Sequence, residues 1–214
     1  MSPRSPEFIV VEGPIGVGKT TLARRLADSL RTTLLLEQAE ENPFLPAFYR
    51  DSRAAALPTQ LHFLFQRARQ VQALRQSDLF RRDHVADFLV QKDELFARAT
   101  LNADELDLYY QVYNRLALDT PAPDLVIYLQ APVDVLLRRI RSRGFAYERR
   151  IEEDYLKRIA DAYVEFFYHY HASPLLIVNT ADLNLAEGER NYELLLERVR
   201  ANTPGRHFFN PREL

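Results

Sequence analysis

The sequence contains no cysteine and no tryptophan, and only one methionine and six glycines among its 214 residues. Without cysteine, disulfide bonds, thiol catalysis and thiolate metal sites are excluded. The five histidines are scattered along the chain and do not have the HExxH spacing of a metalloprotease. We therefore expect any metal ion to arrive with a bound ligand rather than to occupy a dedicated protein site.

The chain also lacks a large excess of charge and a long apolar run. It has 28 Lys and Arg against 30 Asp and Glu, so the basic surface of a dedicated nucleic-acid-binding protein is not expected. No apolar run approaches the about 20 residues that cross a bilayer, and MSPRSPE leads into a strand rather than the apolar core of a signal peptide. These absences favour a small-molecule ligand, no nucleic-acid or membrane partner, and a cytoplasmic location.

The length and the apolar content, 47%, predict a single domain over residues 1–214. Apolar runs predict five strands, at residues 8–12, 32–37, 84–90, 125–130 and 174–180. Apolar spacing of about 3.6 residues predicts six helices, at about residues 20–30, 42–76, 104–118, 133–144, 153–170 and 186–201. This alternation predicts an α/β fold in which helices cover both faces of a five-stranded parallel sheet. The tail, about 203–214, is expected to be loosely ordered.

A glycine-rich loop follows the first apolar run and precedes the first helix. Its residues match the pattern G-x-x-x-x-G-K-[ST] and its flanks: Gly13, Pro14, Ile15, Gly16, Val17, Gly18, Lys19, Thr20 and Thr21. In such a loop, backbone N–H groups surround phosphate oxygens at the positive end of the helix. Lys19 would bridge the β- and γ-phosphates, and the Thr20 hydroxyl would bind Mg²⁺. The sequence therefore predicts a P-loop fold, of the three-layer α/β/α type, that binds ATP with Mg²⁺.

A phosphate loop alone does not distinguish a GTPase switch, an ATPase motor and a kinase. The sequence has neither the NKxD pattern nor the DxxG pattern of GTPases. It is short for an ABC-type or helicase ATPase. A small kinase is the interpretation that fits.

Six segments match one kinase family in order and spacing: FIVVEGPIGVGKTTLARRLA, LLLEQAEENPFLPAFY, QLHFLFQRARQ, DFLVQKDELFA, PDLVIYL and RRIRSRGFAYERRIEEDYL. Over most of its length, Phe8 to about Thr180, the chain resembles the deoxynucleoside kinases, which include deoxyadenosine, deoxyguanosine and deoxycytidine kinases. The resemblance implies transfer of the γ-phosphoryl group of ATP to a deoxynucleoside 5′-hydroxyl. It also implies a homodimer, built here from helices 55–76 and 104–118.

The resemblance assigns the acceptor side to a spaced set of residues. Glu37, which closes the second strand, would accept the proton of the 5′-hydroxyl, although Glu40 and Glu41 lie in the same segment. Tyr49 would bind the sugar 3′-hydroxyl. Gln60, eleven positions later, would read the base edge with its amide.

Two charged residues complete the base side in the resemblance. Arg67 lies seven positions after Gln60, two helical turns away on the same face, and could pair with the carboxylate of Asp93. In the family, this arginine and aspartate accompany adenine, guanine and cytosine, whereas thymidine-preferring members have smaller apolar residues there.

The segment RIRSRG resembles the family's lid, which here covers about 139–150. Arg139 and Arg143 would fold over the transferring phosphoryl group and neutralise its charge. Glu148, five residues after Arg143, stands where the family has the second ligand of the 3′-hydroxyl, and Tyr155 also falls in register.

The chain departs from the family after the third strand, where the family has Asp/Glu-Arg-Ser and this sequence has Asp87, Phe88 and Leu89. Asp87 can still help to hold Mg²⁺ through water. The arginine is absent, and we expect Lys92 to replace its charge, although Arg81 or Arg82 could also do so.

The lid departs as well, because Phe145 stands in place of its second arginine. One phosphate contact would then be absent or come from Arg141, Arg149 or Arg150.

These two departures from the family pattern leave two further interpretations of the function open. One is a kinase of nucleoside monophosphates or another small alcohol, and the second is a nucleotide-binding regulatory protein that has lost catalysis.

Overall fold

The computed structural model describes residues 5–77, 83–116, 121–183 and 188–210. The described strands are β1 (Phe8–Glu12), β2 (Thr33–Leu35), β3 (His84–Ala86), β4 (Leu125–Gln130), β5 (Leu175–Asn179) and β6 (Arg206–Phe209). The described α-helices are α1 (Lys19–Leu30), α2 (Leu45–Phe48), α3 (Ser52–Ser77), α4 (Lys92–Thr100), α5 (Ala103–Leu116), α6 (Val133–Arg143), α7 (Glu153–Tyr168) and α8 (Glu189–Ala201). Two 3₁₀ turns are η1 (Ala39–Glu41) and η2 (Glu148–Arg150).

The strands form one parallel sheet in the order β2-β3-β1-β4-β5-β6. Strand β1 lies between β3 and β4, and four of its five residues are buried, which explains its continuous apolar run. Because all the strands are parallel, their carboxyl ends meet at one edge of the sheet. The segments that follow β1, β2 and β3 therefore come together there.

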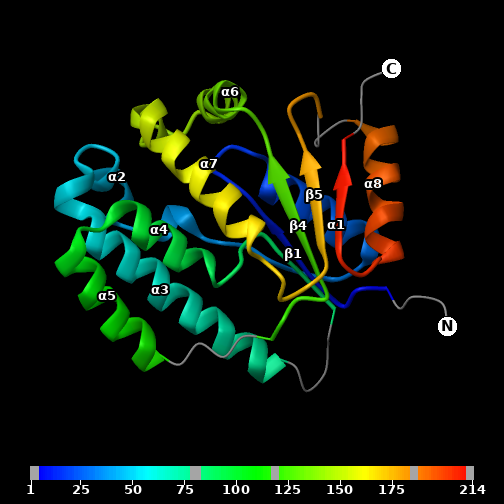
Figure 1. The fold of residues 1–214 in the computed structure, drawn as a ribbon, viewed down its shortest axis with the longest axis horizontal. Helices are drawn as coiled ribbons and strands as arrows, with labels where there is room; N and C mark the ends of the chain where they lie inside the picture. Colours follow the sequence, from blue (N-terminus) through cyan, green and yellow to red (C-terminus); the bar gives the residue numbers. More distant parts are fainter. Residues whose placement is uncertain (1–4, 78–82, 117–120, 184–187, 211–214) are drawn as a thin grey trace.

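Helices cover both faces of this sheet. Figure 1 shows the strands running between α7 on one side and α8 on the other. From α7, Tyr163 and Phe167 stack on Tyr128 of β4, while α1 contacts β1, β2 and β3. The predicted α/β fold with a parallel sheet is confirmed.

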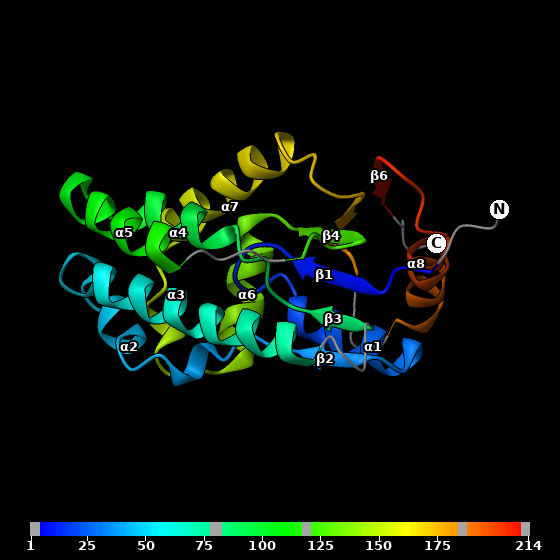
Figure 2. The same ribbon diagram turned by 90° about the horizontal axis from the view of Figure 1, so that it is seen from below.

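A helical lobe adjoins the sheet on the side of α7. It consists of α2, α3, α4 and α5, and Figures 1 and 2 both show α3 and α5 alongside each other. Leu64, Ala97 and Tyr109 form a separate buried cluster between these helices. The lobe provides a second wall beside the carboxyl edge of the sheet.

The predicted number of strands is wrong, because the sheet has a sixth strand. Residues Arg206–Phe209, in the tail that we expected to be loosely ordered, pair in parallel with β5. The Arg206 guanidinium donates to the carbonyls of Phe167 at 2.9 Å and Tyr168 at 3.0 Å, at the end of α7. These bonds to a distant helix are not visible in the local pattern.

Two element boundaries also differ from the prediction. The expected helix over 42–76 is interrupted at residues 49–51, where the Asp51 carboxylate accepts the N–H groups of Arg53 at 3.2 Å and Ala54 at 3.4 Å and begins α3. The third strand ends at Ala86 instead of residue 90. The chain then turns into α4, which the periodicity did not indicate.

Candidate active site

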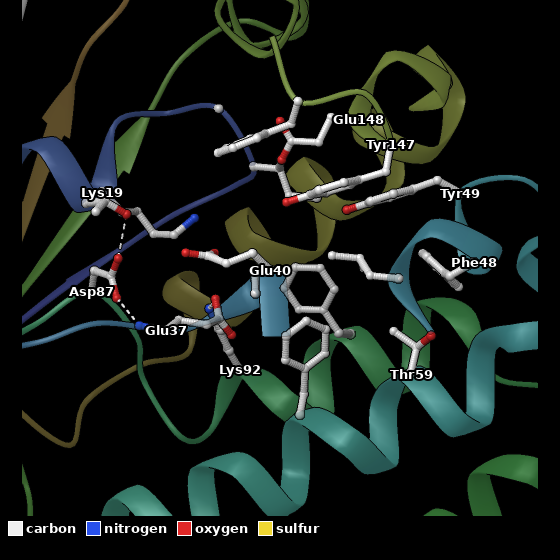
Figure 3. Close-up of a pocket in the computed structure, with 18 of the residues that line it drawn as sticks. Lys19, Glu37, Glu40, Phe48, Tyr49, Thr59, Asp87, Lys92, Tyr147 and Glu148 are labelled. Carbon is white, nitrogen blue, oxygen red and sulfur yellow. Dashed lines mark hydrogen bonds and ion pairs between the residues drawn. The ribbon is translucent and has the colours of Figure 1, made fainter. Parts of the chain in front are cut away.

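Two adjoining hollows share the phosphate loop. The central pocket, drawn in Figure 3, lies between that loop, α3, α4 and the segment 143–148. The outer cavity is bordered by residues 16–21, 34–38 and 181–183 and by Arg139, Ser142 and Arg143. Lys19, Thr20 and Glu37 line both, so a group held by the phosphate loop faces both spaces.

The phosphate loop is held by backbone geometry and by its lysine. Gly16 has φ +82, and a Cβ there would lie 2.7 Å from Cγ1 of Ile140, so only glycine lets the loop lie against α6. The Lys19 ammonium donates to the carbonyls of Gly13 at 2.8 Å and Pro14 at 3.2 Å. Burial, with the charge of Lys92 as the next cause, lowers the pKa of Lys19. The predicted loop residues thus form one turn at the start of α1.

Asp87 joins the phosphate loop to the second strand. Its carboxylate accepts the Thr20 hydroxyl at 2.5 Å and the backbone N–H of Glu37 at 2.7 Å. Burial raises the pKa of the Asp87 carboxyl, and the Thr20 bond opposes that shift. The hydroxyl and the carboxylate are oxygen donors of the kind that Mg²⁺ prefers, so the two residues fit a cation carried by the phosphates of a nucleotide.

Glu37 lies between two cations. One carboxylate oxygen accepts the Lys92 ammonium at 2.7 Å, and the other accepts the Arg67 guanidinium. Burial alone would raise the pKa of Glu37, but Lys92 and Arg67 outweigh it and hold that pKa at about 2. Glu37 is therefore a carboxylate at neutral pH.

Lys92, the residue expected to replace the absent arginine, is buried beside Glu37 at the start of α4. Its burial opposes ionisation, but the carboxylates of Glu12 and Glu37 raise the pKa of Lys92 overall. Phe88, which occupies the arginine position, is buried among apolar side chains. Arg81 and Arg82, which the sequence also offered as sources of this charge, lie outside the described residues.

Gln60, Arg67 and Asp93 all line the central pocket. Arg67 bonds both Asp93 and Glu37. Burial raises the pKa of Asp93 to about 6, while Arg67 opposes that shift. The Asp93 oxygen not bonded to Arg67 is buried and has no hydrogen-bond partner in the described residues.

The orientation of the Gln60 amide follows from its neighbour. Its nitrogen donates to the Thr100 hydroxyl oxygen at 3.2 Å, and that hydroxyl donates to the Phe96 carbonyl at 2.7 Å. Because the Thr100 proton is used in this way, its oxygen accepts from the amide nitrogen. The Gln60 carbonyl oxygen and one amide proton are left for a ligand, which is a donor and acceptor pair.

Tyr49 and Glu148 line the same pocket and lie on the same side of it, across from Glu37 and Lys92 (Figure 3). Burial raises the pKa of Tyr49 well above its usual value, so its hydroxyl keeps its proton. Glu148 is buried and accepts two bonds from the Arg143 guanidinium, one of them at 3.1 Å. Arg143 lines both hollows.

Arg139 lines the outer cavity but not the central pocket. Its guanidinium donates to the hydroxyl and carbonyl of Thr180, at 3.0 and 2.5 Å, and to the carbonyl of Leu183 at 3.2 Å. It also reaches the Val17 carbonyl in the phosphate loop at 3.4 Å. Contact between Arg139 and a phosphoryl group stays a prediction.

Glu12 is a site residue that the sequence alone did not reveal. It ends β1, is fully buried, and accepts the N–H groups of Gly13 at 2.7 Å and Leu89 at 3.1 Å and the Tyr163 hydroxyl at 3.0 Å. Lys92 lies 3.5 Å away. The signal was a carboxylate at the end of an otherwise apolar strand, directly before the phosphate loop.

Two kinds of feature are absent from the described residues. They contain no group of three or more His, Cys, Asp or Glu side chains arranged to hold a metal ion. Within the same ranges, no helix combines the length and apolar character needed to cross a membrane.

The sequence and the structure match known proteins over most of the chain. The family model described as deoxynucleoside kinase matches residues 9–203. A deoxyguanosine kinase of Bacillus subtilis (strain 168) is 36% identical over 82% of this chain and 86% of its own length. A deoxyadenosine kinase of Lactobacillus acidophilus is 29% identical over 90% of this chain and 94% of its own. Among solved structures, the deoxyadenosine kinase from M. mycoides with products dCMP and a flexible dCDP bound has a TM-score of 0.78 at 24% identity, over 89% of this chain and 97% of that one.

Proposed function

The chain belongs to the deoxynucleoside kinase family, and on that premise we propose that it transfers the γ-phosphoryl group of ATP to the 5′-hydroxyl of a deoxynucleoside. Deoxyadenosine, deoxyguanosine and deoxycytidine are favoured over thymidine. The observation that carries the proposal is the ionised Glu37 carboxylate, which borders both the central pocket and the outer cavity.

Glu37 has the chemistry and the position of the group that receives the acceptor proton. As the 5′-oxygen bonds to the γ-phosphorus, its proton passes to Glu37, and the bond from that phosphorus to the bridging oxygen of ADP breaks. Lys92 and Arg67 hold the two carboxylate oxygens and so fix the orientation of Glu37. Most of the catalytic effect then comes from positioning and charge.

The pairing of the basic side chains favours a neutral acceptor over a phosphorylated one. An acceptor monophosphate would need a cation free to bind it beside Glu37. Among the described residues on the acceptor side of the central pocket, Lys92, Arg67 and Arg143 each pair with a carboxylate. This charge balance supports a nucleoside rather than a nucleoside monophosphate.

The remaining pocket residues receive roles that match their chemistry. Gln60 offers its donor and acceptor pair to the base edge, beside Arg67 and Asp93. Tyr49 and Glu148 would bind the sugar 3′-hydroxyl. The names of the relatives, which include deoxyguanosine and deoxyadenosine kinases, and the dCMP bound to the structural neighbour support adenine, guanine and cytosine as the bases.

The donor side would hold ATP with Mg²⁺. Backbone N–H groups of the phosphate loop would bind the phosphates, Lys19 would bridge the β- and γ-phosphates, and Thr20 and Asp87 would hold the cation. When bound, Mg²⁺ neutralises charge on the phosphate oxygens. Arg139 and Arg143 would add positive charge from the lid.

We also propose that the protein is a homodimer through α3 and α5. These helices contact each other and expose two large apolar side chains, Phe65 at 48% and Leu108 at 46%. A second copy that covers this face would remove them from water. Light scattering coupled to size-exclusion chromatography measures the mass, and a monomer at micromolar concentration would contradict this part of the proposal.

The test of the proposed function compares wild type with Glu37→Gln and with Glu41→Gln, an exposed neighbour, as the control. Each protein is incubated with Mg-ATP and, separately, every natural deoxynucleoside, ribonucleoside and deoxynucleoside monophosphate, and the products are resolved by chromatography. We expect wild type and the control to phosphorylate deoxynucleosides, and Glu37→Gln to be about 100- to 10,000-fold slower. Product from monophosphates alone, or from no acceptor, overturns the proposal.

A further inference from the structure

Three aromatic rings connect the lid to the wall of the central pocket. Phe145 stacks on Tyr147 with ring centres 5.7 Å apart and an interplanar angle of 9°. Tyr147 stacks in turn on Tyr49, at 6.2 Å and 2°. We call these three side chains the lid stack. Offset parallel rings at these separations attract each other beyond the area that they bury.

The lid stack is anchored at both ends. On the pocket side, Tyr49 packs against Phe48 at 5.4 Å and against Tyr155 at 6.2 Å, and both of these side chains are buried. On the lid side, the Arg143 guanidinium lies 5.2 Å from the centre of the Phe145 ring. The lid stack is therefore a continuous contact from the core to the lid arginine.

The backbone turn between Gly144 and Glu148 places Tyr147 against Tyr49. Gly144 ends α6 with φ +81, and the N–H of Glu148 then donates to the Phe145 carbonyl at 3.1 Å. The Arg143–Glu148 pair closes the same turn. Tyr147 and Glu148 thus enter the pocket together, although Tyr49 is almost 100 residues away in sequence.

The hydroxyl groups of Tyr49 and Tyr147 also point in the same direction. In Figure 3 their rings lie one over the other, and both hydroxyls point toward the side of the pocket where Lys19 and Asp87 lie. Burial raises the pKa of both, so both are neutral at pH 7. Two neutral hydroxyls side by side suit the hydroxyls of a sugar and need no counter-charge.

From this geometry we propose that Tyr147 is an acceptor-positioning residue supplied by the lid. Its ring holds the Tyr49 ring in the orientation that meets the sugar, and its hydroxyl borders the space that the sugar occupies. The inference rests on the proposed function. It adds a second lid residue, beside Glu148, that acts on the deoxynucleoside, and it assigns Phe145 a stacking role where the family has an arginine.

The test measures KM for the deoxynucleoside and for ATP separately in wild type, Tyr147→Ala, Tyr147→Phe and Tyr168→Ala. Tyr168 is 68% exposed at the end of α7 and is a matched control for the loss of a tyrosine ring. We expect Tyr147→Ala to raise the deoxynucleoside KM about 5- to 10-fold and to leave the ATP KM within about 2-fold. Tyr147→Phe keeps the ring and should recover most of that loss, and Tyr168→Ala should behave as wild type.

Three results with the Tyr147 variants would overturn the inference while the proposed function stands. Unchanged kinetics in Tyr147→Ala would show that the ring does not position the acceptor. An equal rise in both KM values would indicate a general fault of the lid. A Tyr147→Phe variant as impaired as Tyr147→Ala would show that stacking is not the cause. A wild-type protein that phosphorylates no deoxynucleoside overturns the proposed function and this inference together, so the two failures are distinguishable.

Discussion

The ammonium nitrogen of Lys92 lies 2.7 Å from Oε2 of Glu37, and Lys92 comes from the start of α4 rather than from the end of β3. A positive charge beside Glu37, the proposed catalytic carboxylate, is therefore present although Phe88 stands at the arginine position. Lysine supplies a point charge, whereas arginine supplies a planar fork. In this chain Arg67 bonds the other oxygen of Glu37 through one guanidinium nitrogen, and its second terminal nitrogen bonds Asp93.

Replacing Lys92 with methionine should move the acid limb of the pH-activity profile upward. Wild-type Glu37 has a pKa of about 2, because Lys92 and Arg67 outweigh its burial. Without Lys92, burial has less opposition, the pKa rises, and Glu37 becomes protonated at a higher pH. We expect kcat/KM to be about 10- to 100-fold lower at pH 7.5 and its acid limb to lie at a higher pH than the acid limb of wild type.

The matched control for this change is Lys157→Met. Lys157 is exposed and pairs with the exposed Asp161 one turn further along α7, so the pH-activity profile of Lys157→Met should equal that of wild type.

The lowered pKa of Glu37 also predicts how the stability of the folded protein depends on pH. Glu37 has its folded pKa below the unfolded value of about 4.3, so its contribution is present above that pH and is lost as the pH falls toward about 2. An acid limb that stays in place in Lys92→Met would contradict the assignment.

Restoring the family arginine by Phe88→Arg should destabilise the protein rather than improve it. Phe88 is 4% exposed and lines a small crevice with Val10, Val71 and other apolar side chains. A guanidinium there would be buried without a partner, at a cost of about 2 to 4 kcal/mol in the free energy of unfolding. Urea unfolding measures this loss, and the exposed Phe208→Arg should lose less than about 0.5 kcal/mol.

A combined variant separates charge from packing. If Phe88→Arg in the Lys92→Met background restores activity above that of Lys92→Met alone, the arginine reaches Glu37 and the structural argument fails. We expect no such recovery, because the Phe88 side chain occupies the apolar crevice rather than the central pocket.

The sequence could predict those parts of the site that lie in contiguous patterns. The phosphate loop is one uninterrupted segment between a strand and a helix, and Glu37 directly follows an apolar run. Both positions follow from parallel strands that end at one edge of the sheet. Lys92 could be chosen as the replacement charge because it lies close in sequence to the departure at Phe88.

The parts that could not be predicted depend on contacts between distant segments. The partners of Glu12 include Leu89 and Tyr163, so its role is not visible in the strand that it ends. The lid stack joins Tyr49 to Phe145 and Tyr147, almost 100 residues away. Local periodicity carries no information about which distant ring a given ring will meet.

Replacing only Arg67 of the buried Arg67–Asp93 pair should lower the free energy of unfolding much more than replacing both residues. Both side chains are almost fully buried. Arg67→Met leaves the Asp93 carboxylate without its partner, and we expect a loss of about 3 to 5 kcal/mol in the free energy of unfolding. Adding Asp93→Ala removes the stranded charge and should recover more than half of that loss.

Urea unfolding of the two single variants and the double variant gives the coupling energy. The control is Arg138→Met, which breaks an exposed pair with Asp134 and should cost less than about 1 kcal/mol. Equal destabilisation of Arg67→Met and the double variant would contradict the prediction, because it would show that the unpaired Asp93 carries no penalty.

Gly16 and Gly144 provide a comparison in which the backbone is the same and the surroundings differ. Their φ angles are +82 and +81, so alanine is strained equally at both, by roughly 1 to 2 kcal/mol. At Gly144 an added Cβ meets nothing within 4 Å, whereas at Gly16 it would lie 2.7 Å from Cγ1 of Ile140 and 2.9 Å from the Leu136 carbonyl oxygen. That oxygen belongs to the backbone of α6 and cannot move away by itself, so Gly16→Ala must displace the phosphate loop.

We expect Gly16→Ala to raise the ATP KM more than about 10-fold and Gly144→Ala to raise it less than about 3-fold. Thermal unfolding of both variants checks that they fold. Equal effects on the ATP KM would mean that the left-handed backbone, and not the contact with α6, is what requires glycine in the phosphate loop.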